Sequence, residues 1–188
     1  YFGLQLINIG LSFVLPIFVQ SVLHATPMTA GLMLLPGALV GAIIAPLAGR
    51  LYDRRGANLP LLTSASLAAI AMLLFLICTA RLTIILITLL YIVLRIGFNT
   101  GFGTAVSDAS LHVNVRQKAD QNSMFSMMQQ FAGSLGTGLM SAVIAAESLH
   151  AKVIPATING TRIDFVVLLL MALLILTTGI LVARRKAA

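Results

Sequence analysis

Charged residues are scarce in this sequence: they make up 9% of its 188 residues, whereas hydrophobic residues make up 59%. No stretch has the composition of a soluble domain, and six long hydrophobic stretches account for most of the chain. A hydrocarbon core about 30 Å thick is crossed by roughly 20 apolar residues of helix. In lipid, only helices and closed barrels satisfy their backbone groups, and these stretches lack the alternation of barrel strands. The sequence therefore predicts an all-α membrane protein, a bundle of six transmembrane helices.

The residues that most enzymes and metal sites need are also rare. Cys78 is the single cysteine, so no internal disulfide forms and no cysteine-based metal site is expected. The Gly-Ser-Leu-Gly stretch 133–136 invites comparison with intramembrane serine proteases, which pair the serine with a histidine on a neighbouring span. The histidines (His24, His112 and His150) all fall between the hydrophobic stretches. We therefore expect no enzyme, no metal and no cofactor.

The positive charges predict the orientation of the bundle, which we take as one domain over residues 1–188. The expected spans are residues 2–23, 30–48, 59–79, 82–106, 122–146 and 163–183. Eight Lys and Arg residues fall on one side of these spans: Arg50, Arg54, Arg55, Arg116, Lys118, Arg184, Arg185 and Lys186. Arg81, Lys152 and Arg162 fall on the other side. The positive-inside rule places both ends of the segment in the cytoplasm, across the cytoplasmic membrane. Charges confined to short loops in this way do not indicate a nucleic-acid partner.

Polar side chains form a stripe on the first and on the fifth expected span. Those of the first span lie within an arc of about 120° of a helix. Polar groups in lipid are costly, so such stripes are expected to face a cavity or to join helices by hydrogen bonds. We favour a cavity, with these candidate lining residues: Gln5, Asn8, Ser12, Gln20, Arg95, Asn99, Ser126, Gln130 and Thr137.

Small residues recur at helical spacing in the second, fourth and fifth spans, which lets helix backbones approach closely. The residues expected at such contacts are Gly37, Gly41, Ala45, Gly97, Gly101, Gly133 and Gly136. In the second span, Pro36 and Pro46 are expected to kink the helix.

Arg95 is the sole charge deep within an expected span. An arginine at membrane depth needs a partner or water and marks a candidate functional site. No carboxylate is expected at a comparable depth, since Asp53, Asp108, Asp120, Glu147 and Asp164 lie at span ends or in connectors. Two alternatives stay open: Arg95 reaches a membrane surface, or its partner lies outside this chain.

The connector after the second span carries the most specific motif, Gly49-Arg50-Leu51-Tyr52-Asp53-Arg54-Arg55-Gly56. Its pattern Gly-x-Leu-x-Asp-Arg-x-Gly resembles the signature loop of the major facilitator superfamily. Residues 34–38, 46–51, 95–97 and 129–137 are similar to the C-terminal half of the fourteen-span multidrug proton antiporters of the EmrB/QacA type. The resemblance covers the whole chain as helices nine to fourteen.

The resemblance implies alternating access between two six-helix bundles, with export of amphipathic or cationic drugs driven by proton entry. Its implied partners are the N-terminal half of the same transporter, the lipid bilayer, a drug-like substrate and protons. Within the motif, Arg50, Asp53 and Arg54 would form a cytoplasmic latch, with Gly49, Arg55 and Gly56 around them. The sequence begins Tyr-Phe-Gly, without an initiator Met or a leader, which suggests a piece of a longer protein. A self-assembling half-transporter or channel is the alternative.

Overall fold

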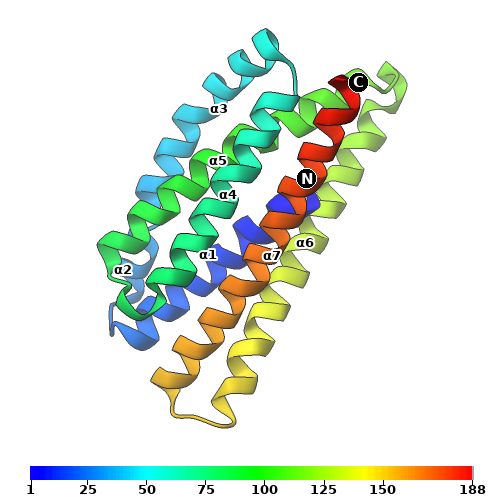
Figure 1. The fold of residues 1–188 in the computed structure, drawn as a ribbon. Coiled ribbons are helices and arrows are strands. Elements are labelled where there is room, and N and C mark those ends of the chain that lie inside the picture. The colour runs from blue at the N-terminus through cyan, green and yellow to red at the C-terminus, as the bar shows by residue number, and fades with distance from the viewer. Residues whose placement is uncertain (188) are drawn as a thin grey trace.

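The computed structural model describes residues 1–187, with side chains up to residue 184. All regular elements in this part of the chain are helices, joined by short connectors (Figure 1). The α-helices are α1 (Phe2–Val22), α2 (Pro27–Leu32), α3 (Leu35–Arg55), α4 (Asn58–Cys78), α5 (Ile84–Leu111), α6 (Lys118–Ser148) and α7 (Val153–Ala187). Two short 3-10 turns, η1 (Thr79–Arg81) and η2 (Val115–Gln117), lie in connectors. The prediction of an all-α membrane bundle with six long helices is confirmed.

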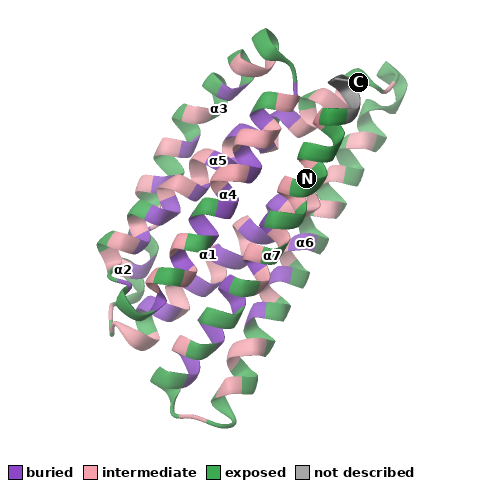
Figure 2. Cartoon of the chain, viewed as in Figure 1, coloured by how far each residue is buried: buried purple, intermediate pink, exposed green. Residues whose placement is uncertain are grey.

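The long helices pack against one another in several pairs. The α1 helix packs against α6 and α7, while α5 packs against α3 and α4, and α4 also packs against α7. The α5 and α6 helices scarcely touch each other. The core between these helices is apolar, with the rings of Phe75 and Phe165 5.2 Å apart. In contrast, α3 and α6 expose much of their length (Figure 2).

Five of the described helical segments are long and apolar enough to cross a membrane: 2–22, 27–55, 58–81, 84–111 and 153–184. The 31-residue α6 is not among them, although it runs alongside the others (Figure 1). Its polar stripe explains this, because residues such as Asn122, Ser126 and Gln130 lower its mean hydropathy.

The connectors are shorter than expected, because polar residues continue the helices. The motif 49–56 is not a loop: α3 continues to Arg55, and Gly56, at φ +71°, ends it. A residue without a Cβ adopts that backbone conformation at little cost. Likewise, the connector expected over 147–162 is largely helical, since α7 begins at Val153. Membrane boundaries within these helices stay predictions.

The second expected span is divided in two. Thr26 caps α2 by accepting a hydrogen bond from the backbone N–H of Thr29 at 3.2 Å, with Pro27 in the first turn. The helix is interrupted after α2, and Pro36 lies in the first turn of α3. Backbone N–H groups in a first turn have no partner within the helix, so the missing N–H of proline costs no hydrogen bond there. Pro36 therefore begins a helix instead of kinking one, and Pro46 alone lies inside α3.

The predicted contact glycines of α5 and α6 lie where helices approach closely. A Cβ on Gly97 would lie 3.1 Å from the carbonyl oxygen of Ser64, and one on Gly101 would overlap the Ser64 side chain, both on α4. A Cβ on Gly136 would lie 3.3 Å from the carbonyl oxygen of Leu6 on α1. Ala45 is the exception, since it is exposed on α3.

Candidate functional site

Arg95 is the centre of a polar cluster that joins α1, α3 and α5. Its Nη1 donates a hydrogen bond to Oδ1 of Asn8 at 2.7 Å, and its guanidinium lies over the ring of Phe98, 5.3 Å from the centroid. The arginine is half-buried, and its Nε is buried without a hydrogen-bond partner among the described residues. The positive charge is thus held by a neutral amide and an aromatic face, which stabilise it without cancelling it.

Two glycines of α3 bring that helix against the same part of α5. A Cβ on Gly37 would lie 2.5 Å from the ring of Tyr91 and 3.1 Å from Cγ of Arg95. A Cβ on Gly41 would overlap the amide of Asn99, whose Nδ2 donates to the carbonyl oxygen of Arg95 at 2.9 Å. The spacing of four residues therefore places both glycines beside the Arg95 cluster.

Ser12 extends the cluster along α1. Its hydroxyl lies 3.1 Å from the hydroxyl of Tyr91 and shares a hydrogen bond with it. The Ser12 hydroxyl also reaches the carbonyl oxygen of Asn8 at 2.7 Å. Polar contacts within an apolar bundle orient side chains strictly, because an unpaired group there has no water to bond. The facing sides of α1 and α5 are therefore polar along this stretch.

Aromatic rings continue this face toward α6. The rings of Phe98 and Phe102 are stacked with centroids 5.3 Å apart, and Tyr1 lies 5.4 Å from Phe102 and 4.5 Å from Phe125 of α6. The Tyr1 hydroxyl donates to Oε1 of Gln129 at 3.3 Å. Together these groups form an aromatic row beside the Arg95 cluster, a combination suited to a ligand with a flat apolar body and a polar group.

The structure brings together five of the predicted lining residues: Gln5, Asn8, Ser12, Arg95 and Asn99. Gln5 joins through the Tyr1 hydroxyl, to which its Nε2 donates at 3.4 Å. The other four lie apart. Gln20 is exposed and donates to the carbonyl oxygen of Pro16 at 3.1 Å, and Thr137 bonds within its own helix to Gly133. Ser126 and Gln130 are exposed on α6, and no described hydrogen bond joins them to the cluster.

Sequence reasoning missed the aromatic residues of this face. Tyr91, Phe98 and Phe102 share one side of α5 with Arg95, at spacings of four, three and four residues. That is the spacing of residues on one helix face. The signal was present, but aromatic residues do not stand out in a span that is apolar all round.

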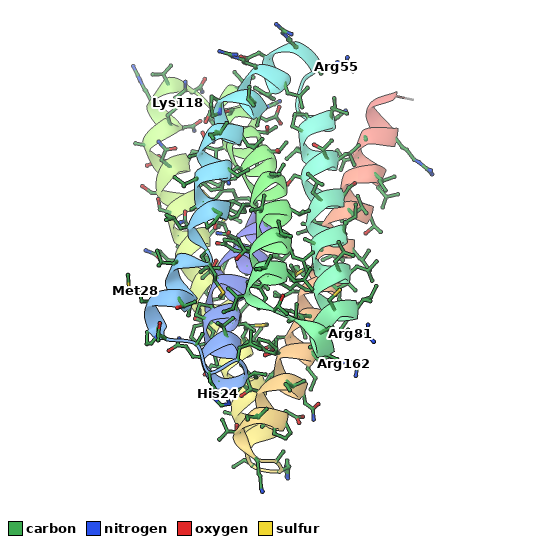
Figure 3. The ribbon with its side chains drawn as sticks, turned by 90° about the vertical axis from the view of Figure 1, so that its left-hand side faces the viewer. His24, Met28, Arg55, Arg81, Lys118 and Arg162 are labelled. Carbon is green, nitrogen blue, oxygen red and sulfur yellow. The ribbon has the colours of Figure 1, made fainter. Side chains whose placement is uncertain are left out.

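The motif 49–56 lies at the end of the bundle that also carries Lys118, while Arg81, Arg162 and His24 lie at the opposite end (Figure 3). Arg54 and Arg55 are exposed in the last turn of α3, where positive charge is favourable to the helix dipole. Asp53 is exposed as well, as are Gly49, Arg50 and Gly56, and a Cβ on Gly49 would meet nothing within 4 Å. The side chain that ties this end to α5 is Tyr52, which donates to Oδ1 of Asp108 at 3.4 Å.

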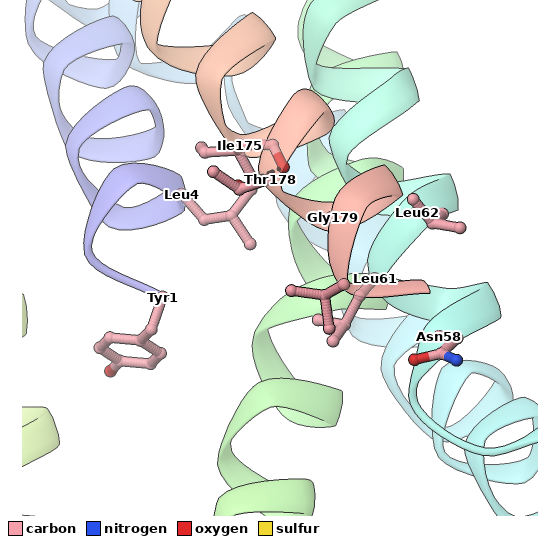
Figure 4. A pocket seen from close by; sticks show the side chains of 9 residues that line it. Tyr1, Leu4, Asn58, Leu61, Leu62, Ile175, Thr178 and Gly179 are labelled. Carbon is pink, nitrogen blue, oxygen red and sulfur yellow. Dashed lines mark hydrogen bonds between the residues drawn. The ribbon is translucent and has the colours of Figure 1, made fainter. Parts of the chain in front are cut away.

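A pocket of about 240 Å³ lies elsewhere, between α1, α4 and α7 (Figure 4). It is lined mainly by apolar side chains such as Leu4, Leu62 and Ile175. The hydroxyl of Thr178, one of its few polar groups, is already bonded to the carbonyl oxygen of Leu174 at 2.8 Å. Asn58 and Tyr1 also line this pocket, but no charged side chain does, and the Arg95 cluster is the better candidate site because it holds a charge among polar groups of α1 and α5.

A bundle of apolar helices with a polar cluster between them is the architecture of a membrane transporter domain. Residues 1–137 match the family model of the Major Facilitator Superfamily, and the chain belongs to this family of multi-pass membrane transporters.

Curated relatives agree with this assignment. The chain is 30% identical over 169 residues to the Uncharacterized MFS-type transporter YcnB of Bacillus subtilis, covering 88% of this chain and 36% of the relative. It is 31% identical to the Multidrug resistance protein B homolog of Mycobacterium tuberculosis, covering 77% of this chain and 27% of the relative. It is 29% identical to the Lincomycin resistance protein LmrB of Listeria monocytogenes, covering 77% and 32%. The chain thus spans about a third of the length of these relatives. No solved structure matches.

Proposed function

We propose that this chain is the C-terminal six-helix half of a fourteen-span drug:proton antiporter, which exports amphipathic or cationic drugs by alternating access. The N-terminal half of the same transporter is the proposed partner, and the bundle lies in the cytoplasmic membrane with both ends of the segment in the cytoplasm. The family match and the relatives named for multidrug and lincomycin resistance support a drug transporter.

The observation that carries this proposal is the combination of Arg95 with the aromatic row. Arg95 retains a positive charge that no carboxylate of the described chain pairs with, and a buried Nε without a hydrogen-bond partner. A carboxylate of the N-terminal half, or a polar group of the substrate, would satisfy it. The neighbouring, half-buried rings of Phe102 and Tyr1 offer stacking surface for the apolar part of a drug.

Alternating access is supported by the glycine contacts. Gly37 and Gly41 let α3 approach α5 closely, and Gly133 and Gly136 let α6 approach α1 closely. Helices packed through small residues shift against each other with little repacking. The charged end of α3 would then serve as the cytoplasmic latch, with Arg50, Asp53 and Arg54 stabilising one of the two states.

The test is drug accumulation in efflux-deficient cells that express this chain alone or joined to its upstream half. We expect export from the joined form only, and its loss when the proton gradient is collapsed. In the joined form, Asp53→Asn and Arg95→Ala should reduce export, whereas Arg81→Ala, which changes an exposed arginine at the opposite end, should not. Export by the short chain would favour the self-assembling half-transporter, and export by neither form would refute a drug-efflux function.

A further inference from the structure

Asp164 is a fully buried carboxyl group in α7, although it was expected at the end of a span. The α7 helix begins well before Asp164, at Val153, so Asp164 lies inside the bundle, and its exposed fraction is 0%. Neither carboxyl oxygen has a hydrogen-bond partner among the described residues. Most other buried polar side chains are satisfied: the hydroxyls of Thr79, Thr100 and Thr104, for example, bond to carbonyl oxygens of their own helices.

The surroundings of Asp164 follow from its neighbours one turn away on the same face of α7. A Cβ on Gly160 would lie 2.9 Å from Cα of Ile144 on α6. Leu168 lies one turn after Asp164. A Cβ added to Gly10 of α1 would lie 3.6 Å from Cδ2 of Leu168 and 3.6 Å from Cγ of Met140 on α6, so these three residues are neighbours. Asp164 therefore lies in the seam where α7 meets α1 and α6, among apolar groups.

No positively charged side chain is buried in the described part of the helices around this seam. The α1 helix carries no titratable side chain, and α4 carries only Cys78, near its end. On α6 the titratable groups are Lys118, Asp120 and Glu147; on η1 there is the exposed Arg81; and on α7 the nearest charge is the exposed Arg162. Glu147 follows Ile144 by one turn of α6, toward the start of α7 and away from Asp164. An ionised carboxylate without a partner is strongly disfavoured in such a place, so the group is accommodated as the neutral acid.

Thr161 supplies the one polar group close by. It lies one turn before Asp164 and is also 0% exposed, and its hydroxyl, unlike that of Thr157, makes no hydrogen bond among the described residues. Threonine hydroxyls in helices usually bond to the carbonyl three or four residues earlier. The Thr161 hydroxyl is therefore free to donate to a carboxylate at position 164.

From this geometry we infer that Asp164 is a proton-binding site of the transporter, separate from the Arg95 cluster and assisted by Thr161. In the state described here, the buried side chain is the carboxylic acid. When α7 parts from α6 at the Gly160 contact, water enters; the acid then releases its proton to water and becomes a carboxylate, which Thr161 stabilises by donating a hydrogen bond. Closing the seam requires a proton to bind again. This inference rests on the proposed proton antiport and assigns one site to it.

The test uses the joined transporter in proteoliposomes, with Asp164→Asn, Asp164→Glu and Thr161→Val. The matched control is Asp120→Asn, which neutralises an exposed carboxylate on α6. Two transport modes are compared with a lipophilic cationic drug as probe: accumulation driven by a proton gradient, and drug-for-drug exchange, which needs no net proton movement. Infrared spectroscopy follows the C=O stretch of protonated carboxylic acids as the pH is raised.

We expect Asp164→Asn to lower proton-driven accumulation by about tenfold or more while exchange continues, because a carboxamide releases no proton. Thr161→Val should lower accumulation less, and Asp120→Asn should match the wild type. The infrared band of a buried acid should disappear in Asp164→Asn, shift in Asp164→Glu, and bleach in the wild type as the pH rises. Asp164→Glu keeps the assignment testable if the asparagine variant fails to fold.

Equal proton-driven accumulation by Asp164→Asn and wild type would overturn the site, as would a carboxylic-acid spectrum that none of these changes alters. The failure of the proposed antiport looks different. In that case the wild type itself would not respond to the proton gradient, while the infrared band would still report whether Asp164 binds and releases a proton.

Discussion

Replacing Gly101 with alanine tests the close approach of α4 and α5. An added Cβ would lie 2.6 Å from Cβ of Ser64 and 3.1 Å from Cδ1 of Leu4. The Cβ of Ser64 is fixed to the α4 backbone, so a side-chain rotation does not relieve the overlap, and α4 has to move. Overpacking of this kind costs about 1–3 kcal/mol. Alanine returns about 0.5–1 kcal/mol through its better helix propensity, so the net loss lies between about 0 and about 2.5 kcal/mol.

Gly103 provides the matched control, since it lies two residues further along the same helix and an added Cβ there meets nothing within 4 Å. Gly103→Ala should be neutral or stabilising, because only the propensity term acts. Both variants share the propensity gain, so at about 2–4 °C per kcal/mol for a chain of this size Gly101→Ala should melt about 2–12 °C below Gly103→Ala. Thermal unfolding of the detergent-solubilised protein measures the difference. Adding Ser64→Gly to Gly101→Ala removes the overlapping Cβ and should restore part of the loss. Equal melting temperatures for Gly101→Ala and Gly103→Ala would refute the proposed packing.

Three further changes probe the site and the end of α3. Arg95→Lys keeps the charge but loses the planar donor group that reaches Asn8 and covers Phe98, so drug export should fall while the protein still folds; unchanged export would remove Arg95 from the site. Tyr52→Phe deletes the hydrogen bond to Asp108 and should lower the melting temperature slightly, because an interhelical hydrogen bond is lost; no change would mean that the contact is not formed in the membrane. Gly56→Ala places a Cβ at φ +71° and ψ −175°, a conformation essentially restricted to glycine, and should cost about 1–3 kcal/mol, measured in the same way. Its control, Gly49→Ala, meets no neighbour and should be neutral or stabilising.

The hydrophobic stretches were sufficient to predict the long helices, but not where the helices end. Membrane insertion selects apolar residues only within the bilayer, whereas hydrogen bonding continues a helix for as long as the backbone allows. Arg50 and Asp53 therefore extend α3 as polar turns, and residues 153–162 extend α7. The error at α7 had a consequence for the site analysis, because it placed Asp164 at the end of a span, whereas Asp164 lies well inside the helix and is buried.

The Arg95 cluster was only partly predictable. A lone charge in an apolar span and a polar stripe on the first helix are visible in the sequence, and they selected Arg95, Asn8 and Ser12 as candidate lining residues. The structure joins Arg95 to Asn8 by a hydrogen bond, and a cavity lined by these residues stays a prediction. Their partners depend on helix rotation and on which helices are adjacent, and periodicity alone does not supply either. For the same reason the stripe on α6 was assigned to a common cavity with α1, whereas Ser126 and Gln130 are exposed and not bonded to the cluster.

Because α3 is one helix from Leu35 to Arg55, a tilt at one point along it moves its end. Its contact with α5 at Gly41 lies fourteen residues from Arg55, about 20 Å along a helix that rises 1.5 Å per residue. A tilt of about 10° around that contact would displace the arginine-bearing tip by about 4 Å, enough to break the 3.4 Å hydrogen bond from Tyr52 to Asp108 that ties this end to α5. A small rearrangement beside Arg95 would therefore be magnified at the far end of the same helix, and a flexible loop over residues 49–56 would have absorbed that movement.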